Sequence, residues 1–441
     1  MGDGLMRNPL RKPAVVLASA VLVATAACSG EAIRDDRGDA DGTPGARSTR
    51  GMGFSGDPKV QPALAFERKP AHVIPIGPME HPPVTLYGRA VWIADEAGVT
   101  AVDVTTGRTI TRVRPRHKPL YKTHQPRHLT SDEGENLQYR VLPPQVAQIN
   151  GAPAVLAIVP VELGSRDGGA PQNGFEVIAV RAADAKVIWR LPVDIDGEPD
   201  GRLGASVWRP PYHGMAAVQW TVDGGLRGTF AIALEKPRLL WQRTDFELID
   251  GYQQALVGFR DNGDDTYTIA GASLADGRDM WNLSELSGEI SAGGRYDESY
   301  GGGPWSLVDD ALGARLVEIA TGDTALSEAT GLNADMTCGM REGGSAVLCA
   351  SKKAGALALD VGTGDVLWER APGTGPDAWS GTVSTITKDY AYVDRSDGPA
   401  VIDVRSGKVV GADSGIVPDR ANAYAGLVFT GTDIEIHLPR S

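Results

Sequence analysis

One short phrase recurs along the chain and constrains its fold more than any other feature. Its clearest copy, residues 356–370, holds two apolar runs, 356–359 and 366–368, separated by the turn-forming group at 360–364. Gly supplies the positive φ that a tight reversal needs, and Asp or Thr side chains can accept hydrogen bonds from the free amides of the turn. This copy therefore predicts a β-hairpin.

Weaker copies of the phrase lie on both sides of it. An acid and a Gly stay four residues apart at 101–108, 317–323 and 401–408, and only the apolar outline remains at 177–189, 232–241 and 270–281. Paired apolar runs of this kind are found at 90–103, 154–179, 216–234, 256–274, 305–319, 346–360, 391–403 and 426–438. Such self-similarity predicts a repeat protein.

The composition favours many short strands over long helices. The chain has 55 Gly and 29 Pro, and no stretch after residue 27 keeps a 3.6-residue apolar period. We expect an all-β fold, a β-propeller of four-stranded blades, with eight blades and seven as the alternative. The net charge of −13 argues against nucleic acid and anionic membrane surfaces as partners, because both require a positive face.

The last of the paired runs is incomplete. It stops at residue 438, where the other copies continue into the turn and an outer strand. A strand near residues 60–73 could pair with it and close the ring, which would leave no exposed sheet edge at either end. We therefore expect N- and C-terminal strands to share one blade.

The N-terminus predicts export. Three bases, Arg7, Arg11 and Lys12, precede an apolar run at residues 14–27 that is too short for a stable membrane span and ends in small residues before Cys28. Residues 22–30 resemble a bacterial lipobox, although Thr replaces the usual Leu three residues before the Cys. The resemblance implies lipidation of Cys28 and attachment to the outer face of the cytoplasmic membrane, with ordinary secretion as the alternative.

The composition changes along the chain suggest three parts. Residues 1–27 are expected to be a signal peptide, and 28–66 a flexible tether, because that polar segment cannot bury enough apolar surface to order itself. Residues 67–441 are expected to form the propeller. The spacing between turn glycines is unusually long after residue 107, which predicts an insertion around 112–150.

Two cysteines remain once Cys28 is set aside. A two-residue turn at 343–344 would place Cys338 directly opposite Cys349 on neighbouring strands, at a Cα separation of about 5.5 Å if they form a hydrogen-bonded pair. An exported chain lies in a compartment where they can be oxidised. We expect a cross-strand disulfide, with two reduced and buried cysteines as the alternative.

The phrase Ala-Leu-Asp-x-x-Thr-Gly-x-x-Leu-Trp at residues 358–368 resembles the repeat of the PQQ-like β-propeller superfamily. That superfamily includes the pyrroloquinoline-quinone (PQQ) alcohol dehydrogenases and the propeller lipoprotein of the outer-membrane β-barrel assembly machine. The likeness spans about residues 69–441. It implies an eight-bladed ring in which four tryptophans pack between blades: Trp189, Trp241, Trp281 and Trp368. Their apolar neighbours also favour a place in the core over stacking on a ligand.

The residues that quinone chemistry needs cannot be matched to this chain. The quinone enzymes bind calcium, use a catalytic Asp and often carry a disulfide between adjacent cysteines, which this sequence lacks. No Gly-x-Ser-x-Gly, His-Glu-x-x-His or P-loop phrase is present either. We expect no PQQ, no catalytic residue and a binding or scaffold role. A propeller enzyme with a site in the central funnel and a ligand sensor are the alternatives.

One acidic loop could hold calcium. Four carboxylates alternate with other residues beside glycines, the hard oxygen donors that calcium prefers: Asp194, Asp196, Glu198 and Asp200. The loop lacks the twelve-residue spacing of a complete calcium-binding loop. A solvated acidic turn is the alternative.

One block of bases stands out from the acidic composition. Residues 108–128 contain seven Lys or Arg, three His and no acid. We hypothesise that a protein or a cell-wall polymer docks on six of these bases: Arg112, Arg114, Arg116, Lys118, Lys122 and Arg127. A solvated loop that balances nearby acids is the alternative. The propeller itself is expected to be monomeric.

Overall fold

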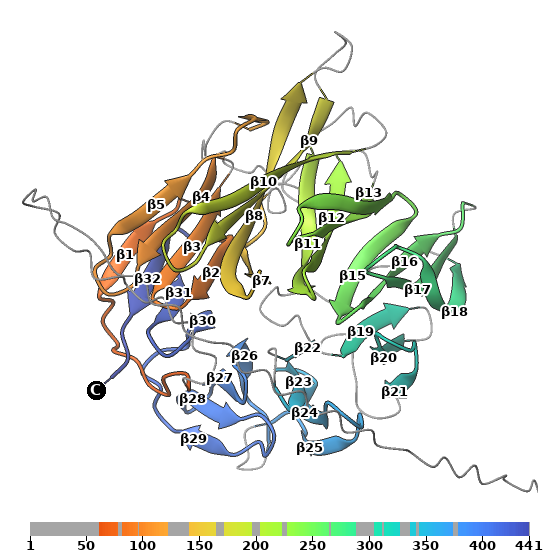
Figure 1. Ribbon diagram of the computed structural model, residues 1–441. Coiled ribbons are helices and arrows are strands. Elements are labelled where there is room, and N and C mark those ends of the chain that lie inside the picture. The colour runs from red at the N-terminus through yellow and green to blue at the C-terminus, as the bar shows by residue number, and fades with distance from the viewer. Residues whose placement is uncertain are drawn as a thin grey trace, which may run out of the picture. The chain divides into compact units, whose positions relative to one another are not determined.

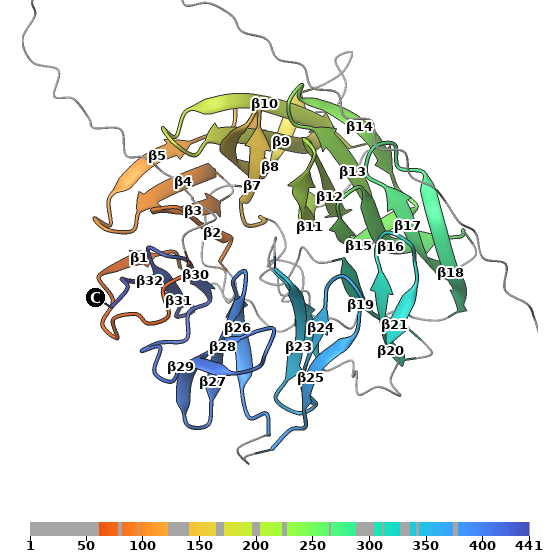
Figure 2. The same ribbon diagram turned by 60° about the horizontal axis from the view of Figure 1, so that its bottom comes forward.

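A computed structural model of the chain describes residues 61–77, 82–95, 97–121, 141–164, 172–195, 203–222, 227–263, 266–287, 304–310, 313–326, 336–340, 344–373 and 378–440. All of them lie in one compact unit, Gly51–Ser441. They form eight small antiparallel sheets arranged as a β-propeller (Figures 1 and 2). The all-β prediction is confirmed, since the described residues contain strands and turns but no helix. In this part of the chain there is accordingly no helix with the length and apolar character to cross a membrane.

Each sheet is a blade, and blades are numbered by their order along the chain. Blade 1 comprises β2 (Val84–Tyr87), β3 (Ala90–Asp95), β4 (Gly98–Asp103) and β5 (Thr109–Val113). Blade 2 comprises β6 (Lys118–Pro119), β7 (Gln145–Ile149), β8 (Ala152–Gly164), β9 (Gln172–Arg181) and β10 (Val187–Asp194). Blade 3 comprises β11 (Leu203–Tyr212), β12 (Met215–Val222), β13 (Arg227–Ala233) and β14 (Arg238–Arg243), and blade 4 comprises β15 (Phe246–Tyr252), β16 (Ala255–Asp261), β17 (Thr266–Ser273) and β18 (Asp279–Ser287).

Blade 5 comprises β19 (Trp305–Asp310), β20 (Gly313–Glu318) and β21 (Thr324–Leu326), and blade 6 comprises β22 (Thr337–Gly339), β23 (Ala346–Ser351), β24 (Gly355–Asp360) and β25 (Val366–Arg370). Blade 7 comprises β26 (Thr382–Ile386), β27 (Tyr390–Arg395), β28 (Gly398–Asp403) and β29 (Val409–Gly411). Blade 8 comprises β30 (Arg420–Ala421), β31 (Gly426–Phe429), β32 (Asp433–His437) and β1 (His72–Pro75). Every predicted pair of apolar runs corresponds to one antiparallel strand pair, such as β23 with β24.

The recurrent phrase forms the turn that leads into the outer strand of a blade. In blade 6 the Asp360 carboxylate accepts a hydrogen bond from the Gly362 N–H at 2.9 Å, and the Gly364 N–H donates to the Asp360 carbonyl oxygen at 2.8 Å. Gly364 has a φ of 74°, a conformation that favours Gly. The Gly362 N–H and the Arg405 guanidinium also hold the pKa of Asp360 below its usual value. The Asp and Gly that recur in the phrase therefore serve to form the turn.

Tryptophans on the outer strands join neighbouring blades. Three indole Nε1–H groups donate to main-chain carbonyls of the next blade: Trp241 to Leu274 at 2.9 Å, Trp281 to Ile319 at 3.1 Å and Trp368 to Val404 at 2.8 Å. Each ring covers the turn Gly of that blade so closely that an added Cβ would lie 2.7–3.0 Å from it: Gly277, Gly322 and Gly407. Trp189 packs against the core, but its Nε1 is buried without an acceptor among the described residues.

The ring closes through a strand from the N-terminal side, as expected, although this strand begins later than predicted. β1 pairs with β32, with His72 opposite Ile436 and Ile74 opposite Ile434. His72 lies against the turn of blade 1, where its Nε2 donates to the Thr105 carbonyl oxygen at 2.9 Å. A histidine thus makes, at the closing junction, the contact that tryptophans make elsewhere.

The polypeptide preceding β1 is also fixed to the body. The Phe66 side chain is fully buried, with its ring centroid 5.9 Å from that of Tyr392. The Tyr392 hydroxyl donates to the Ala63 carbonyl, and burial raises the pKa of this tyrosine. Ala63 and Phe66, which the predicted tether at 28–66 includes, thus pack against the propeller. The signal peptide, Cys28 and the tether up to residue 60 lie outside the described residues.

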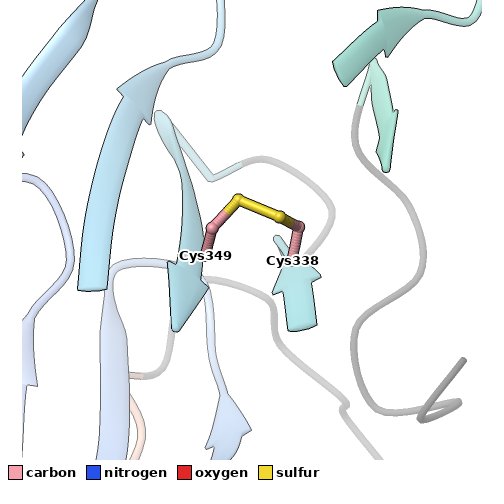
Figure 3. The surroundings of a disulfide bond; sticks show 2 residues. All are labelled: Cys338 and Cys349. Carbon is pink, nitrogen blue, oxygen red and sulfur yellow. A yellow bond between two sulfur atoms is a disulfide. The ribbon is translucent and has the colours of Figure 1, made fainter. Parts of the chain in front are cut away.

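A disulfide joins the first two strands of blade 6 (Figure 3). Cys338 on β22 is directly opposite Cys349 on β23, the register that a turn at 343–344 predicts. Their Cα atoms are 3.9 Å apart, not the roughly 5.5 Å of a hydrogen-bonded pair. The two residues are thus closer to the spacing of a non-hydrogen-bonded pair.

Candidate partner-binding site

Blade 2 contains β8, the longest strand of the described residues. β8 has 13 residues and pairs along one edge with β9. Its other edge is shared, because β7 pairs with its first half and β6 with its end, where Lys118 is opposite Glu162. The predicted insertion thus begins with a segment that leaves β5 of blade 1 and joins blade 2 at β6. Residues 112–118 of this connection are called the basic segment.

Exposure alternates along the basic segment. The four bases at its even positions are exposed: Arg112, Arg114, Arg116 and Lys118. Between them, Val113 is buried, and Pro115 and His117 are partly buried. Residues 112 and 113 end β5 and residue 118 begins β6, whereas residues 116 and 117 form a bend, so the alternation is one of exposure and not of a single extended strand. The segment therefore displays a stripe of four positive side chains to solvent.

A fully buried glutamate, Glu176, holds the backbone of this segment. Its carboxylate accepts hydrogen bonds from the Arg116 N–H at 2.9 and 3.0 Å and from the His117 N–H at 3.0 Å. The His117 ring adds a contact of 2.6 Å from Nδ1 to Glu176 Oε2. Two successive amides thus point at one carboxylate, which fixes the bend at residues 116–117.

Arg190 on β10 completes this arrangement. Its Nε lies 3.4 Å from Glu176 Oε1, an ion pair without hydrogen-bond geometry, and its Nη2 donates to the Arg114 carbonyl oxygen at 3.1 Å. Glu176 itself lies in the middle of β9, between Val159 of β8 and Pro192 of β10. A buried carboxylate is stable only with such donors and a counterion. The basic segment is therefore held at Arg114 as well as at residues 116 and 117.

The four bases of the stripe differ in their ion pairs. Those at the two ends face acids, Arg112 to Asp95 at 3.1 Å and Lys118 to Glu162 at 2.6 Å. Exposed pairs of this kind contribute little, about 0–1 kcal/mol. No acidic side chain of the described residues lies within 4.0 Å of the Arg114 or Arg116 guanidinium. The centre of the stripe therefore has uncompensated positive charge.

The other predicted site residues are only partly placed. Lys122 and Arg127 of the basic block lie outside the described residues, as do Asp196, Glu198 and Asp200 of the acidic loop. Asp194 ends β10 opposite Gly174. In the described part of the chain no three or more His, Cys, Asp or Glu side chains are grouped as metal ligands. The calcium site stays a prediction.

Sequence reasoning found the block of bases but neither its alternating exposure nor its support. Glu176 is a single acid inside the run Phe175–Val180, whose other members are apolar and fully buried. An isolated acid in a strand with two buried faces is a signal that a buried polar partner must exist. The sequence does not show that this partner is the backbone 60 residues earlier.

The sequence matches no protein family and no curated protein. Solved structures resemble the fold at low identity. BamB from Moraxella catarrhalis is 12% identical over 84% of this chain and 99% of that chain, with a TM-score of 0.39. A europium-containing methanol dehydrogenase is 10% identical over 83% and 81%, with a TM-score of 0.40. The dihydro-heme d1 dehydrogenase NirN is 14% identical over 86% and 74%, with a TM-score of 0.44. These likenesses do not assign an activity.

Proposed function

We propose that this chain is a non-catalytic β-propeller that serves as a binding platform in the cell envelope. Lipid on Cys28 would attach it to the outer face of the cytoplasmic membrane, and the basic segment would dock an anionic protein or polymer. The main support is the exposed stripe, whose central bases, Arg114 and Arg116, have no acidic partner among the described residues. On a chain with a net charge of −13, such a surface attracts anions locally.

The rigidity of the segment adds to this argument. Glu176 and Arg190 bind its backbone, so the main chain that carries the bases is already ordered before a partner binds. A solvated loop that only balanced nearby acids would not require a buried carboxylate to hold its main chain. The buried carboxylate of Glu176, together with Arg190, thus holds the segment that carries the stripe.

Crosslinking and pull-down from intact cells test the platform. The wild-type chain is compared with an Arg114→Gln/Arg116→Gln variant, which removes the two unpaired charges. Arg238→Gln/Arg278→Gln is the matched control, because it removes two exposed charges from blades 3 and 4.

We expect the stripe variant to lose the crosslinked partner while the control retains it. Equal recovery with both variants would contradict docking at the stripe. Release of a Cys28→Ala chain from the membrane fraction tests the lipid anchor separately.

A further inference from the structure

The first described residues, 61–72, run along the outside of the ring from blade 7 to blade 1. The Leu64 carbonyl oxygen lies 3.5 Å from the place that a Cβ on Gly411 of β29 would take. At the other end of the segment, His72 Nε2 lies 2.9 Å from the Thr105 carbonyl oxygen, in the turn that leads into β5. The outer strands β29, β1 and β5 follow one another around the ring (Figures 1 and 2). The chain therefore enters the folded body across these three blades.

Exposed apolar side chains gather along this entry. Among the described residues seven large apolar side chains are exposed, and four of them lie on the entering segment, on β1 or on β29: Leu64, Val73, Val409 and Val410. These four are 38–52% exposed. A single exposed apolar residue is normal in a soluble protein, but a group of them indicates a contact surface.

Exposed bases stand beside these apolar residues, near the start of each outer strand. Lys408 precedes β29, Lys69 lies three residues before β1, and Arg108 precedes β5. All three are exposed, and no acidic side chain of the described residues lies within 4.0 Å of their charged groups. In blades 5 and 6 the residue equivalent to Lys408 is an acid, Asp323 or Asp365. The three bases and the four apolar residues are together called the entry surface.

The acids near the entry surface are mostly engaged by other groups. The Asp413 carboxylate is shared by two guanidinium groups, at 3.2 and 3.3 Å. The Asp403 carboxylate accepts a hydrogen bond from a main-chain amide of its own turn at 2.8 Å. Glu67 is exposed, and the exposed Asp389 directly follows Lys388. The positive charge of the entry surface is therefore only partly offset.

An anionic membrane surface fits both kinds of side chain. Lys and Arg attract lipid phosphates, while apolar side chains beside them enter the boundary between headgroups and acyl chains. A soluble polyanion would leave the valines uncovered, and an uncharged apolar partner would leave the bases unpaired. The net charge of −13 does not oppose this contact, because salt screens exposed charges beyond about 8 Å and the local charge decides.

The predicted lipid on Cys28 would hold this surface near a membrane. As a flexible tether, residues 28–60 would span about 30 Å on average, and they join the body at its entry surface. Tethering raises the effective concentration, so even a weak contact persists. We propose that the entry surface rests on anionic lipid headgroups. This inference rests on the proposed lipid anchor and adds a second membrane contact to it.

Such a contact leaves the stripe of the basic segment free. β5 begins beside Arg108 and ends at Val113, so Arg114 lies about 20 Å further along the extended chain than Arg108. This distance is more than twice the screening length of about 8 Å. A body that rests on its entry surface therefore keeps Arg114 and Arg116 available to a partner.

Vesicle binding tests the contact without the lipid anchor. The chain without residues 1–28 keeps the whole compact unit Gly51–Ser441. It is mixed with vesicles of phosphatidylglycerol and phosphatidylcholine in equal parts, or of phosphatidylcholine alone, and sedimented. We expect binding to the anionic vesicles and much weaker binding to the neutral ones. Binding that is equally strong to both overturns the proposal.

A charge variant and a matched control locate the contact. Each base near an anionic surface contributes about fivefold to the partition coefficient. Lys69→Gln/Arg108→Gln/Lys408→Gln should therefore reduce it roughly 100-fold. The control variant removes three exposed bases from the equivalent turns of blades 3 and 4 and should bind as the wild type does: Lys236→Gln/Arg238→Gln/Arg278→Gln. An equal loss in both variants contradicts a contact at the entry surface.

An apolar variant distinguishes a lipid surface from a purely electrostatic contact. Val409→Thr/Val410→Thr keeps the shape and the strand preference of the two side chains but replaces one methyl group of each by a hydroxyl. Because these methyl groups would leave water on binding, the variant should bind anionic vesicles several-fold more weakly. Unchanged binding would show that lipid does not cover the valines and would overturn the proposal.

The lipid-anchored chain allows a measurement that does not need strong binding. Acylation by a water-soluble reagent reports the exposure of each lysine amine. Lys69 and Lys408 should react several-fold more slowly on anionic than on neutral vesicles, whereas Lys236 in blade 3 should react equally fast on both. Equal rates for Lys69 and Lys408 on both vesicles overturn the contact.

The two proposals can fail separately. If the lysines of the entry surface react equally on both vesicles while crosslinking in cells still depends on the stripe, the membrane contact is wrong and the platform stands. If the entry surface binds anionic vesicles but crosslinking does not depend on the stripe, the platform function fails and the contact stands. Because the substituted side chains are exposed, the variants should keep the wild-type fold, which far-ultraviolet circular dichroism checks.

Discussion

The Glu176→Gln variant is the sharpest test of how the basic segment is held. Gln has the same shape but no charge, and its amide offers one acceptor oxygen and one NH₂ group. The wild-type carboxylate faces three donors of the segment, the amides of Arg116 and His117 and the His117 ring. The Gln oxygen can satisfy at most two of them, and its NH₂ group would face the third donor. Arg190 would lose its counterion.

The magnitude follows from burial. Removing one partner from a buried ion pair costs about 3–5 kcal/mol. Glu176 is fully buried, but the His117 and Arg190 side chains are 33% and 20% exposed, so water can partly replace the lost contacts. We therefore expect the lower end of that range, about 3 kcal/mol of local stability. Since about 1.4 kcal/mol corresponds to a tenfold change, the local opening equilibrium should rise roughly 100-fold.

Hydrogen exchange measures this opening directly. In Glu176→Gln, peptides that cover residues 114–120 should exchange about 100-fold faster, while blades 4 to 7 stay unchanged. Glu162→Gln is the control, because it breaks only the exposed pair with Lys118 and should cost at most about 1 kcal/mol. Wild-type exchange rates for this segment in Glu176→Gln would refute the claim that the carboxylate holds the bend.

Three further predictions concern the propeller itself. Replacing Cys338 and Cys349 by Ala should lower the free energy of unfolding by about 2.8 kcal/mol, the loop-entropy value for a sequence separation of 11, and a mass shift on reduction and alkylation of the wild type checks the bond. Trp368→Phe should cost about 1 kcal/mol more than Trp189→Phe in urea unfolding, because only the Trp368 indole donates a hydrogen bond, and equal losses would argue against it. The Gly415 amide and the Arg440 guanidinium lower the pKa of Asp413 in the folded state. Its contribution to stability is therefore present above about pH 4, the unfolded-state pKa, and is lost as the pH falls through the lowered folded-state pKa. Asp413→Asn should remove this part of the acid dependence of thermal unfolding.

The features that local chemistry determines could be predicted from the sequence. Asp360 and Gly364 identify their turn because an Asx contact and a positive φ are requirements of the reversal itself. The register that places Cys338 opposite Cys349 follows from the position of one short turn. In both cases the residues that make the structure lie within about a dozen positions of each other.

Contacts between distant segments could not be predicted in the same way. Glu176 binds amides 60 residues away, and His72 docks on a turn 33 residues away. No periodicity connects these partners, because each lies where the blades meet or where an insertion returns. The stripe was visible as a run of bases, but its support depends on tertiary packing.

The pairing of β1 with β32 has a consequence for how the chain folds. Ile74 and Ile434 are 360 residues apart, and closing a flexible loop of that length costs about 5 kcal/mol of chain entropy. Contacts within one blade are local and can form early, whereas this one must wait until nearly all of the polypeptide is available. The first strand of the fold can thus pair only after the last strand has been made. Until then the ring is open, with two unpaired strand edges that can associate with other chains.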